Sequence, residues 1–180
     1  TMPRRGYPPE HMQTNNEIIK LHLTFPDMAN TYTQLYVQCV FAPKYRAALL
    51  QPQWDERLRI YISAILKTNG HKLIAINNMP DHLHLFAGFN PIQSISEMKR
   101  IVKGDSPEWI NKEKLTTHKF QWQEGYGAFS YSRSQIDALA KYVMNQQEHH
   151  RKITFLDEYK RMLEKFEVEY DERYIFKAPE

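Results

Sequence analysis

The sequence predicts an α+β fold in which a largely antiparallel sheet carries helices packed against it. Three observations favour this class. Some short segments alternate apolar and polar residues, others repeat apolar residues at helical spacing, and the two kinds are interleaved along the chain. Their order is strand, helix, two closely spaced strands, helix, short strands and helix. A ferredoxin-like, or RRM-like, sandwich fits that order best.

The composition fits a single folded domain preceded by an arm. The chain has 180 residues, of which 42% are hydrophobic, and this is enough for one core. Residues 1–27 contain several prolines and little periodicity, so we expect an irregular N-terminal arm there and one domain over residues 28–180. Residues 18–25 alternate enough to form a short strand within the arm.

Composition also excludes some classes of protein. The single cysteine rules out an intramolecular disulfide, and no secretory signal is recognisable. No apolar run approaches the roughly 20 residues that a membrane-spanning helix needs. We therefore expect a cytoplasmic protein without a membrane partner.

The first half of the domain supplies a strand, a helix and a hairpin. Residues 35–41 are rich in β-branched and aromatic side chains and are followed by a proline, so they predict the first core strand. Residues 54–66 have apolar side chains at helical spacing, and Asn69-Gly70 ends that helix. Residues 71–78 and the histidine-containing segment 79–89 flank a proline turn, which predicts an antiparallel hairpin.

The second half supplies more helices and short strands. Ser94 can cap a helix, with Glu97 completing a capping box, and the segment from Gly104 to Pro107 is expected to interrupt it. The later elements are short strands at 120–122 and 128–131, a helix from Ser134 to His150 and a last helix over about 155–166.

Two histidines one residue apart mark the second strand of the hairpin. Because successive side chains of a strand alternate between its faces, His82 and His84 point the same way while the leucines between and after them point into the core. Two imidazoles on a rigid strand suit a divalent metal that has at least one further ligand.

A tyrosine and a glutamine lie four residues apart in the predicted helix 134–150. That spacing makes Tyr142 and Gln146 neighbours, with His149 close to the same side. A tyrosine hydroxyl can be a covalent nucleophile when a base or a metal-polarised electrophile assists it. The Gln146 amide oxygen suits a hard cation, so His82, His84 and Gln146 form a plausible Mg²⁺ or Mn²⁺ site.

Basic residues are concentrated in the middle of the chain. Residues 41–120 contain 12 Lys and Arg against 7 Asp and Glu, whereas residues 157–180 contain 5 against 8. This asymmetry permits a polyanionic partner, although a solvated mixed surface is the more common cause of such a charge balance. The tentative contacts to a nucleic-acid backbone are Lys44, Arg46, Lys99, Arg100 and Lys103.

These residues carry a resemblance. His82-Leu83-His84 resembles the HUH motif, and Tyr142-Val143-Met144-Asn145-Gln146 the YxxxQ motif, of single-tyrosine HUH transposases of the small insertion-sequence and REP-associated, TnpA-like group. The order and spacing of the motifs match, and the similarity covers about residues 28–176. Flanking segments are similar as well, namely Phe41–Arg46, Met79–His82, Trp122–Ser130 and Glu148–His150.

The resemblance implies a metal-dependent enzyme that nicks and rejoins single-stranded DNA at hairpin-marked element ends through a 5′-phosphotyrosine. It implies Tyr142 as the nucleophile and His82, His84 and Gln146 as ligands of Mg²⁺ or Mn²⁺. His149 and His150 are accessory candidates that could contact phosphate or metal. Members of the family are homodimers, often with the tyrosine helix of one subunit serving the metal site of the other.

Two other functions fit the same residues. A non-catalytic module that binds single-stranded nucleic acid would use the sandwich and its basic segment alone. A metal-dependent hydrolase would use His82 and His84 to activate water and would form no covalent intermediate.

Overall fold

A computed structural model describes residues 32–47 and 49–176. The N-terminal arm expected over residues 1–27, with its short strand at 18–25, lies outside the described residues. From Thr33 onward the chain clusters into one compact unit.

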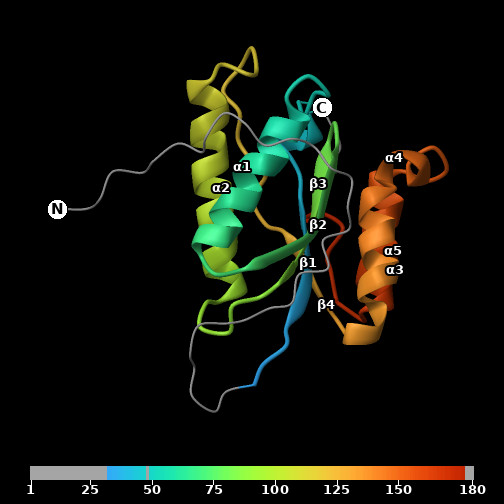
Figure 1. The fold of residues 1–180 in the computed structure, drawn as a ribbon. Coiled ribbons are helices and arrows are strands. Elements are labelled where there is room, and N and C mark those ends of the chain that lie inside the picture. The colour runs from blue at the N-terminus through green and yellow to red at the C-terminus, as the bar shows by residue number, and fades with distance from the viewer. Residues whose placement is uncertain (1–31, 48, 177–180) are drawn as a thin grey trace. The chain divides into compact units, whose positions relative to one another are not determined.

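The centre of this unit is a four-stranded antiparallel sheet (Figure 1). Its strand order is β2-β3-β1-β4, with antiparallel pairing throughout. This is the order of a ferredoxin-like sandwich, so the predicted fold class is confirmed. The strands are β1 (Tyr36–Phe41), β2 (Lys72–Met79), β3 (His82–Gly88) and β4 (Gly127–Tyr131).

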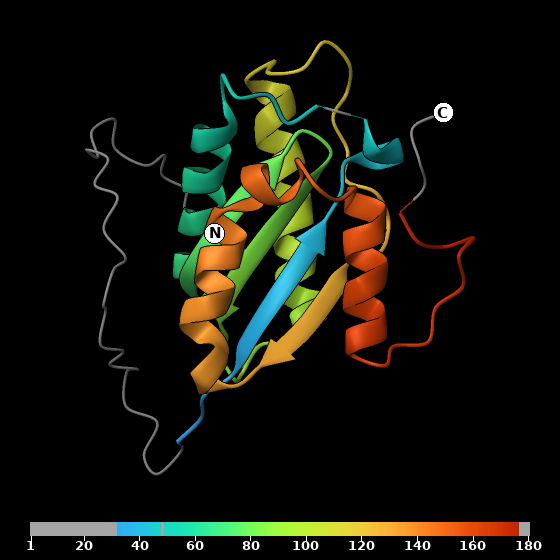
Figure 2. The same cartoon turned by 90° about the vertical axis from the view of Figure 1, so that its right-hand side faces the viewer.

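Helices cover both faces of the sheet. One face carries α1 (Asp55–Thr68) and α2 (Ile95–Lys112). The other carries α3 (Ile136–Met144), the one-turn helix α4 (Gln146–His149) and α5 (Phe155–Lys165), with α3 over the β2–β3 side and α5 over the β1–β4 side (Figure 2). Two short 3₁₀ turns, Lys44–Arg46 and Arg133–Gln135, join these elements.

The side chains of β3 alternate between the two faces of the sheet, so the sequence of this strand determines which residues lie on each face. Leu83 and Leu85 pack with Leu58, Ile62 and Val102 into the core beneath α1 and α2. A fully buried leucine contributes about 1.5–3 kcal/mol relative to an exposed one, so this core anchors the strand firmly. The histidines of the same strand consequently lie on the opposite face, under α3, α4 and α5.

The second helix is longer than predicted. The expected interruption from Gly104 to Pro107 is wrong, because α2 runs through both residues to Lys112. Val102 and Ile110, on either side of the proline, are buried in the same core and hold both halves of the helix on the sheet. A proline removes only one backbone donor, which this packing offsets.

Residues 120–122 form no strand. Trp122 makes an isolated bridge with Pro43, and its indole Nε1 donates to the Ser106 hydroxyl at 2.8 Å. Phe120 and Trp122 are both buried, so their apolar character reflects core packing by a loop.

The predicted helix from Ser134 to His150 is divided. The cap is Ser132, whose capping box with Gln135 opens a 3₁₀ turn that leads into α3. The chain leaves helical geometry at Asn145, between α3 and α4. There the Asn77 side chain, from β2, donates at 3.0 Å to the Met144 carbonyl, an acceptor that a continuous helix would use itself. A tertiary contact therefore ends α3 early.

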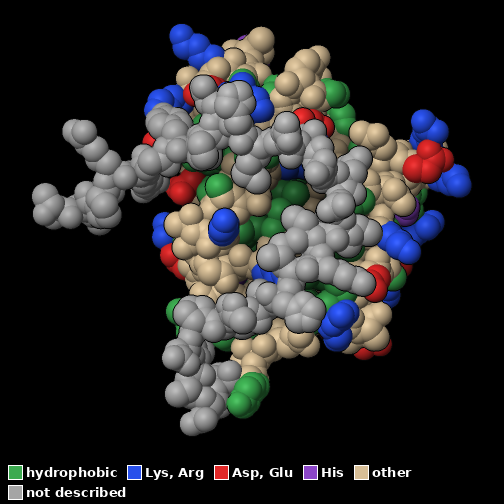
Figure 3. Space-filling view, viewed as in Figure 1, with side chains coloured by type: hydrophobic (Ala, Val, Ile, Leu, Met, Phe, Trp, Pro, Cys, Tyr) green, Lys and Arg blue, Asp and Glu red, His purple; other side chains and the backbone are tan. Residues whose placement is uncertain are grey.

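Both signs of charge occur on one face of the molecule. On the face shown in Figure 3, Lys and Arg side chains lie interspersed with Asp and Glu instead of forming one patch. Among the described residues, none of the helices is both long and apolar enough to cross a bilayer.

Candidate metal and tyrosine site

The two histidines of β3 lie deep inside the unit. Pro80 and Asp81 form the hairpin turn, and His82 pairs with Met79 as the first residue of β3. Only 1% of His82 and 0% of His84 is exposed. The His82 ring stacks on Phe155 of α5, with ring centres 4.1 Å apart and planes 8° from parallel. The predicted convergence of the two imidazoles on one face is therefore present.

A third imidazole, from His150 just after α4, joins this pair. In each of the three rings the Nδ1 atom is engaged by a neighbouring group, which fixes the ring and turns its Nε2 atom inward. The Nδ1 partners are the Asp81 carboxylate at 2.7 Å for His82, the Gln38 side-chain amide at 2.8 Å for His84 and the Ile153 carbonyl at 3.0 Å for His150.

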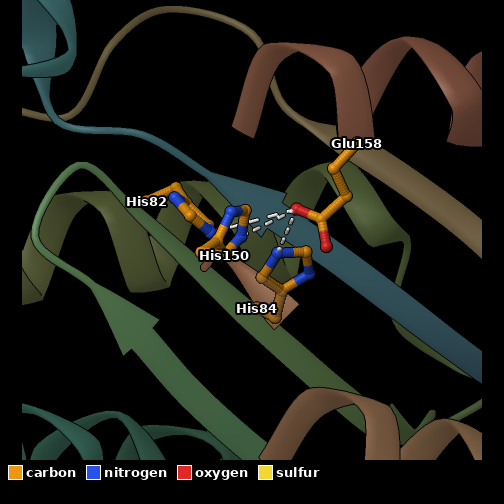
Figure 4. A group of neighbouring side chains, drawn as sticks. All are labelled: His82, His84, His150 and Glu158. Carbon is orange, nitrogen blue, oxygen red and sulfur yellow. Dashed lines mark ion pairs between the residues drawn. The ribbon is translucent and has the colours of Figure 1, made fainter. Parts of the chain in front are cut away.

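A glutamate of α5 faces the three Nε2 atoms (Figure 4). The Oε2 atom of Glu158 lies 3.3 Å from Nε2 of His84, 3.2 Å from that of His150 and 4.0 Å from that of His82. Only 3% of Glu158 is exposed. Within residues 32–47 and 49–176, none of these four atoms finds a hydrogen-bond partner of acceptable geometry. Such buried polar atoms are costly unless something else satisfies them.

This group fits a divalent metal. His82, His84, His150 and Glu158 each offer one ligand atom, and these atoms all lie within 4.8 Å of one another. Imidazole nitrogen and carboxylate oxygen are common ligands of divalent transition metals. The four residues can therefore hold such an ion.

The tyrosine hydroxyl reaches the same carboxylate. Tyr142 donates to Oε1 of Glu158, and Nε2 of Gln146 donates to that oxygen at 3.1 Å. Nε2 of His149 lies 3.3 Å from it. Tyr142 and Gln146 are thus brought together across the break between α3 and α4, and both come from the chain that supplies His82.

The electrostatics of the cluster follow from burial and from the carboxylate. Burial lowers the pKa of His82 to about 4, so its ring is neutral near pH 7 and free to bind a metal. Burial also raises the pKa of Glu158, but the His150 and His84 imidazoles outweigh it and hold that pKa well below its usual range. Burial, with the adjacent Glu158 charge, raises the pKa of Tyr142, so the phenol stays protonated.

Arg46 supports the histidine strand. Tyr45 and Arg46 both have positive φ, 59° and 50°, a left-handed bend that non-glycine residues rarely adopt. Arg46 Nη2 donates to Asp81 Oδ2 at 2.8 Å, so its guanidinium orients the carboxylate that holds His82. Lys44 lies with its Nζ 5.3 Å from the ring centre of Tyr45. Their contacts with DNA stay predictions.

The other predicted basic contacts lie on α2, across the sheet from the metal group. Lys103 donates to the carbonyls of Gln123 and Gly125, and burial lowers its pKa to about 8. Lys103 therefore fixes the loop that contains these carbonyls. Lys99 lies with its Nζ near the ring of Tyr126, and Arg100 forms an ion pair with Glu97 of its own helix at 2.7 Å. The structure does not bring these three residues to the imidazoles.

Sequence reasoning missed Glu158. The signal was available, because Glu158 falls within the apolar stripe of the helix over residues 155–165, beside Phe155, Tyr159 and Met162. A carboxylate in the buried stripe of a helix needs a partner inside the protein. Gln38, a polar residue in an apolar strand, gave a similar signal.

Comparison with known proteins identifies the family to which the chain belongs. A sequence profile described as IS200-like transposase matches residues 31–146, more than half of the chain. The chain belongs to the IS200-like transposase family. The resemblance of the chain to the TnpA-like group of single-tyrosine transposases is thereby confirmed.

Individual transposases are similar in sequence and in fold. The ISDra2 transposase TnpA of Deinococcus radiodurans is 28% identical over 119 residues, which cover 63% of this chain and 84% of that protein. A crystal structure of a candidate transposase from D. radiodurans R1 superposes with a TM-score of 0.54 at 24% identity, covering 68% of this chain and 98% of that one. A REP-associated tyrosine transposase bound to a REP hairpin superposes with a TM-score of 0.50 at 15% identity, covering 70% and 74%. These structures share the fold of the IS200-like chain.

The match to the IS200-like profile covers only part of the site. It ends at residue 146, so Tyr142 and Gln146 lie inside it, together with both histidines of β3. His150 and Glu158 lie beyond it. Among the described elements, α5 therefore adds Glu158 to the group from outside the segment that matches the family profile.

Proposed function

We propose that this IS200-like transposase is a metal-dependent enzyme that nicks and rejoins single-stranded DNA at hairpin-marked ends through a 5′-phosphotyrosine. One observation carries the proposal. The Tyr142 hydroxyl and the imidazoles of His82 and His84, from distant parts of one chain, converge on a single buried carboxylate. The similar fold of a transposase bound to a REP hairpin supports hairpin DNA as the partner.

The residues of this chain divide the reaction between them. Tyr142 Oη attacks the scissile phosphorus as the bond from phosphorus to the 3′-oxygen breaks, and that oxygen takes a proton from water. The tyrosine hydroxyl donates to Oε1 of Glu158, which holds the nucleophile in place, and its proton passes to solvent as the bond to phosphorus forms. His82, His84 and an oxygen ligand such as Gln146 would hold Mg²⁺ or Mn²⁺, which would supply Lewis-acid stabilisation of the phosphate charge.

The covalent intermediate is the direct test. Protein incubated with Mg²⁺ or Mn²⁺ and a single strand bearing a hairpin end should give a protein–DNA adduct that survives denaturing electrophoresis. Tyr142→Phe should abolish the adduct. Tyr61→Phe is the control, because Tyr61 stacks on Trp109 on the opposite face of the sheet from the imidazoles. This variant should still form the adduct.

The other outcomes identify the rival functions. Binding without any adduct, unchanged by a chelator and by Tyr142→Phe, would make the chain a nucleic-acid-binding module. Cleavage that leaves a free 5′-phosphate without covalent protein would make it a hydrolase. An adduct that persists in Tyr142→Phe would remove this tyrosine from its proposed role.

The proposed enzyme is a homodimer, and the position of Tyr142 favours a site built within each subunit. Its ring centre lies 6.0 Å from that of His84 in the same chain. A mixture of Tyr142→Phe and His84→Ala subunits should therefore stay inactive. Recovery of adduct formation on mixing would show that the tyrosine serves the partner's metal site instead.

A further inference from the structure

We infer that His150 and Glu158 complete the metal centre of this chain as ligands beside His82 and His84, and that the centre prefers a transition ion such as Mn²⁺ to Mg²⁺. This inference rests on the proposed function and specifies its metal site. It assigns a role to the segment that follows α4 and to α5, both outside the family match.

The distances suit a shared ion. Two ligands that each lie about 2.0–2.3 Å from one metal are at most about 4.0–4.6 Å apart. The Oε2 atom of Glu158 lies 3.2, 3.3 and 4.0 Å from the Nε2 atoms of His150, His84 and His82, and all the ligand atoms lie within 4.8 Å of one another. A closure of a few tenths of an ångström therefore brings all four atoms into one coordination shell.

Neighbouring groups orient the histidine rings so that the four residues can bind a metal ion. Asp81 and the carbonyl of Ile153 accept from Nδ1 of His82 and of His150, an arrangement typical of metal-bound histidines, and the Gln38 amide holds the His84 ring in place. The four inward atoms, by contrast, are buried within ion-pair distance of the shared carboxylate, and within the described residues none makes a hydrogen bond of acceptable geometry. A cation among them satisfies all four at once.

The last helix is rigidly mounted. The Thr154 hydroxyl caps α5 by accepting from the Asp157 amide at 3.2 Å. Phe155 and Tyr159, on either side of Glu158, are buried in a core that also contains Val40 and Phe129 of the sheet. Ligands fixed by their own packing bind more tightly than mobile ones, so α5 presents a preorganised carboxylate.

The composition of the ligand set determines which ion is preferred. Mg²⁺ prefers oxygen ligands and retains several waters, whereas imidazole suits later divalent ions better. A site with two imidazoles leaves most positions for oxygen. A site with three imidazoles and one carboxylate shifts the preference towards Mn²⁺ and its transition-metal neighbours.

The inference is tested by binding of Mn²⁺ to the full, metal-free chain without DNA, measured by calorimetry and by loss of the free-Mn²⁺ EPR signal. We expect Mn²⁺ to bind at least tenfold more tightly than Mg²⁺. Glu158→Gln and His150→Ala should each weaken Mn²⁺ binding tenfold or more. Glu164→Gln, on the exposed side of the same helix, should leave it unchanged.

Three results would overturn the inference: wild-type Mn²⁺ affinity in Glu158→Gln, wild-type affinity in His150→Ala, or equal affinities for Mn²⁺ and Mg²⁺. If a variant fails to fold, pulsed EPR of the Mn²⁺-loaded wild-type protein decides, because it counts the coordinated imidazole nitrogens. Three coordinated imidazole nitrogens would support the inference, whereas two would exclude His150 as a ligand.

Failure of this inference can be separated from failure of the proposed function. Tight Mn²⁺ binding that depends on Glu158, without any adduct, would remove only the phosphotyrosine mechanism. An adduct that depends on Tyr142, with Mn²⁺ binding indifferent to Glu158 and His150, would remove only the additional ligands.

Discussion

Asp81→Ala is the sharpest test of how the protein holds its proposed metal ligands. The carboxylate of Asp81 contacts His82 Nδ1 at 2.7 Å through one oxygen and accepts from Arg46 at 2.8 Å through the other. The same two partners outweigh burial and lower the pKa of Asp81 to about 2, so it is ionised near neutral pH. Alanine removes the group that fixes the tautomer and the ring orientation of His82.

The expected magnitude follows from these contacts. Removing the partner of a metal-bound histidine typically weakens metal affinity 10- to 100-fold, which corresponds to about 1.4–2.8 kcal/mol. The substitution also leaves the Arg46 guanidinium, whose side chain is 12% exposed, without its carboxylate. We therefore expect an additional loss of about 1–3 kcal/mol in the free energy of unfolding.

Two assays separate the effects. Calorimetry with Mn²⁺ measures affinity, and urea unfolding of the metal-free protein measures stability. Asp55→Ala is the matched control, since Asp55 pairs with Arg59 at 3.0 Å on α1, across the sheet from the imidazoles. It should reduce stability without changing Mn²⁺ affinity. The reasoning is refuted if Asp81→Ala binds Mn²⁺ within twofold of wild type, or if the control weakens binding equally.

Two further predictions concern packing and pH. A Cβ at Gly127 would lie 2.7 Å from Tyr159 Cε2, so Gly127→Ala should destabilise the protein by about 1–3 kcal/mol in urea unfolding. Gly104→Ala, which meets no atom within 4 Å in α2, should stabilise it by about 0.5–1 kcal/mol; equal stabilities of the two variants would contradict this packing. Burial lowers the pKa of His82 to about 4, so the unfolded chain binds more protons between about pH 4 and its ordinary pKa of 6.5. This residue's contribution to the stability of the metal-free protein is therefore lost as pH falls through that window, and NMR titration showing His82 protonated near pH 6.5 would refute the assignment.

Sequence patterns predicted those parts of the fold that depend on neighbouring residues alone, such as strand alternation and turns. The alternation around Leu83 and Leu85 was enough to place both neighbouring histidines on one face, and the proline turn was enough to predict the hairpin. The interleaving of strands and helices then led to the ferredoxin-like class, which the observed strand order confirms.

What the patterns missed depends on contacts between distant segments. The break after α3 follows from a hydrogen bond between Asn77 and Met144, which no helical periodicity reveals. Pro107 suggested a helix end, but the core on both sides of it maintains α2. Glu158 joins the site only because α5 docks on the sheet beside the histidine strand.

The position of α5 at the end of the fold also sets the order in which the site can form during synthesis. All four strands, and then Tyr142, leave the ribosome before Glu158 does. The tyrosine precedes the glutamate by 16 residues, about 1–3 s at ordinary rates of translation. Through that interval the sheet can assemble while its histidine face still lacks α5. Of the described helices, α5 is therefore made last, and it brings the remaining carboxylate to the proposed site.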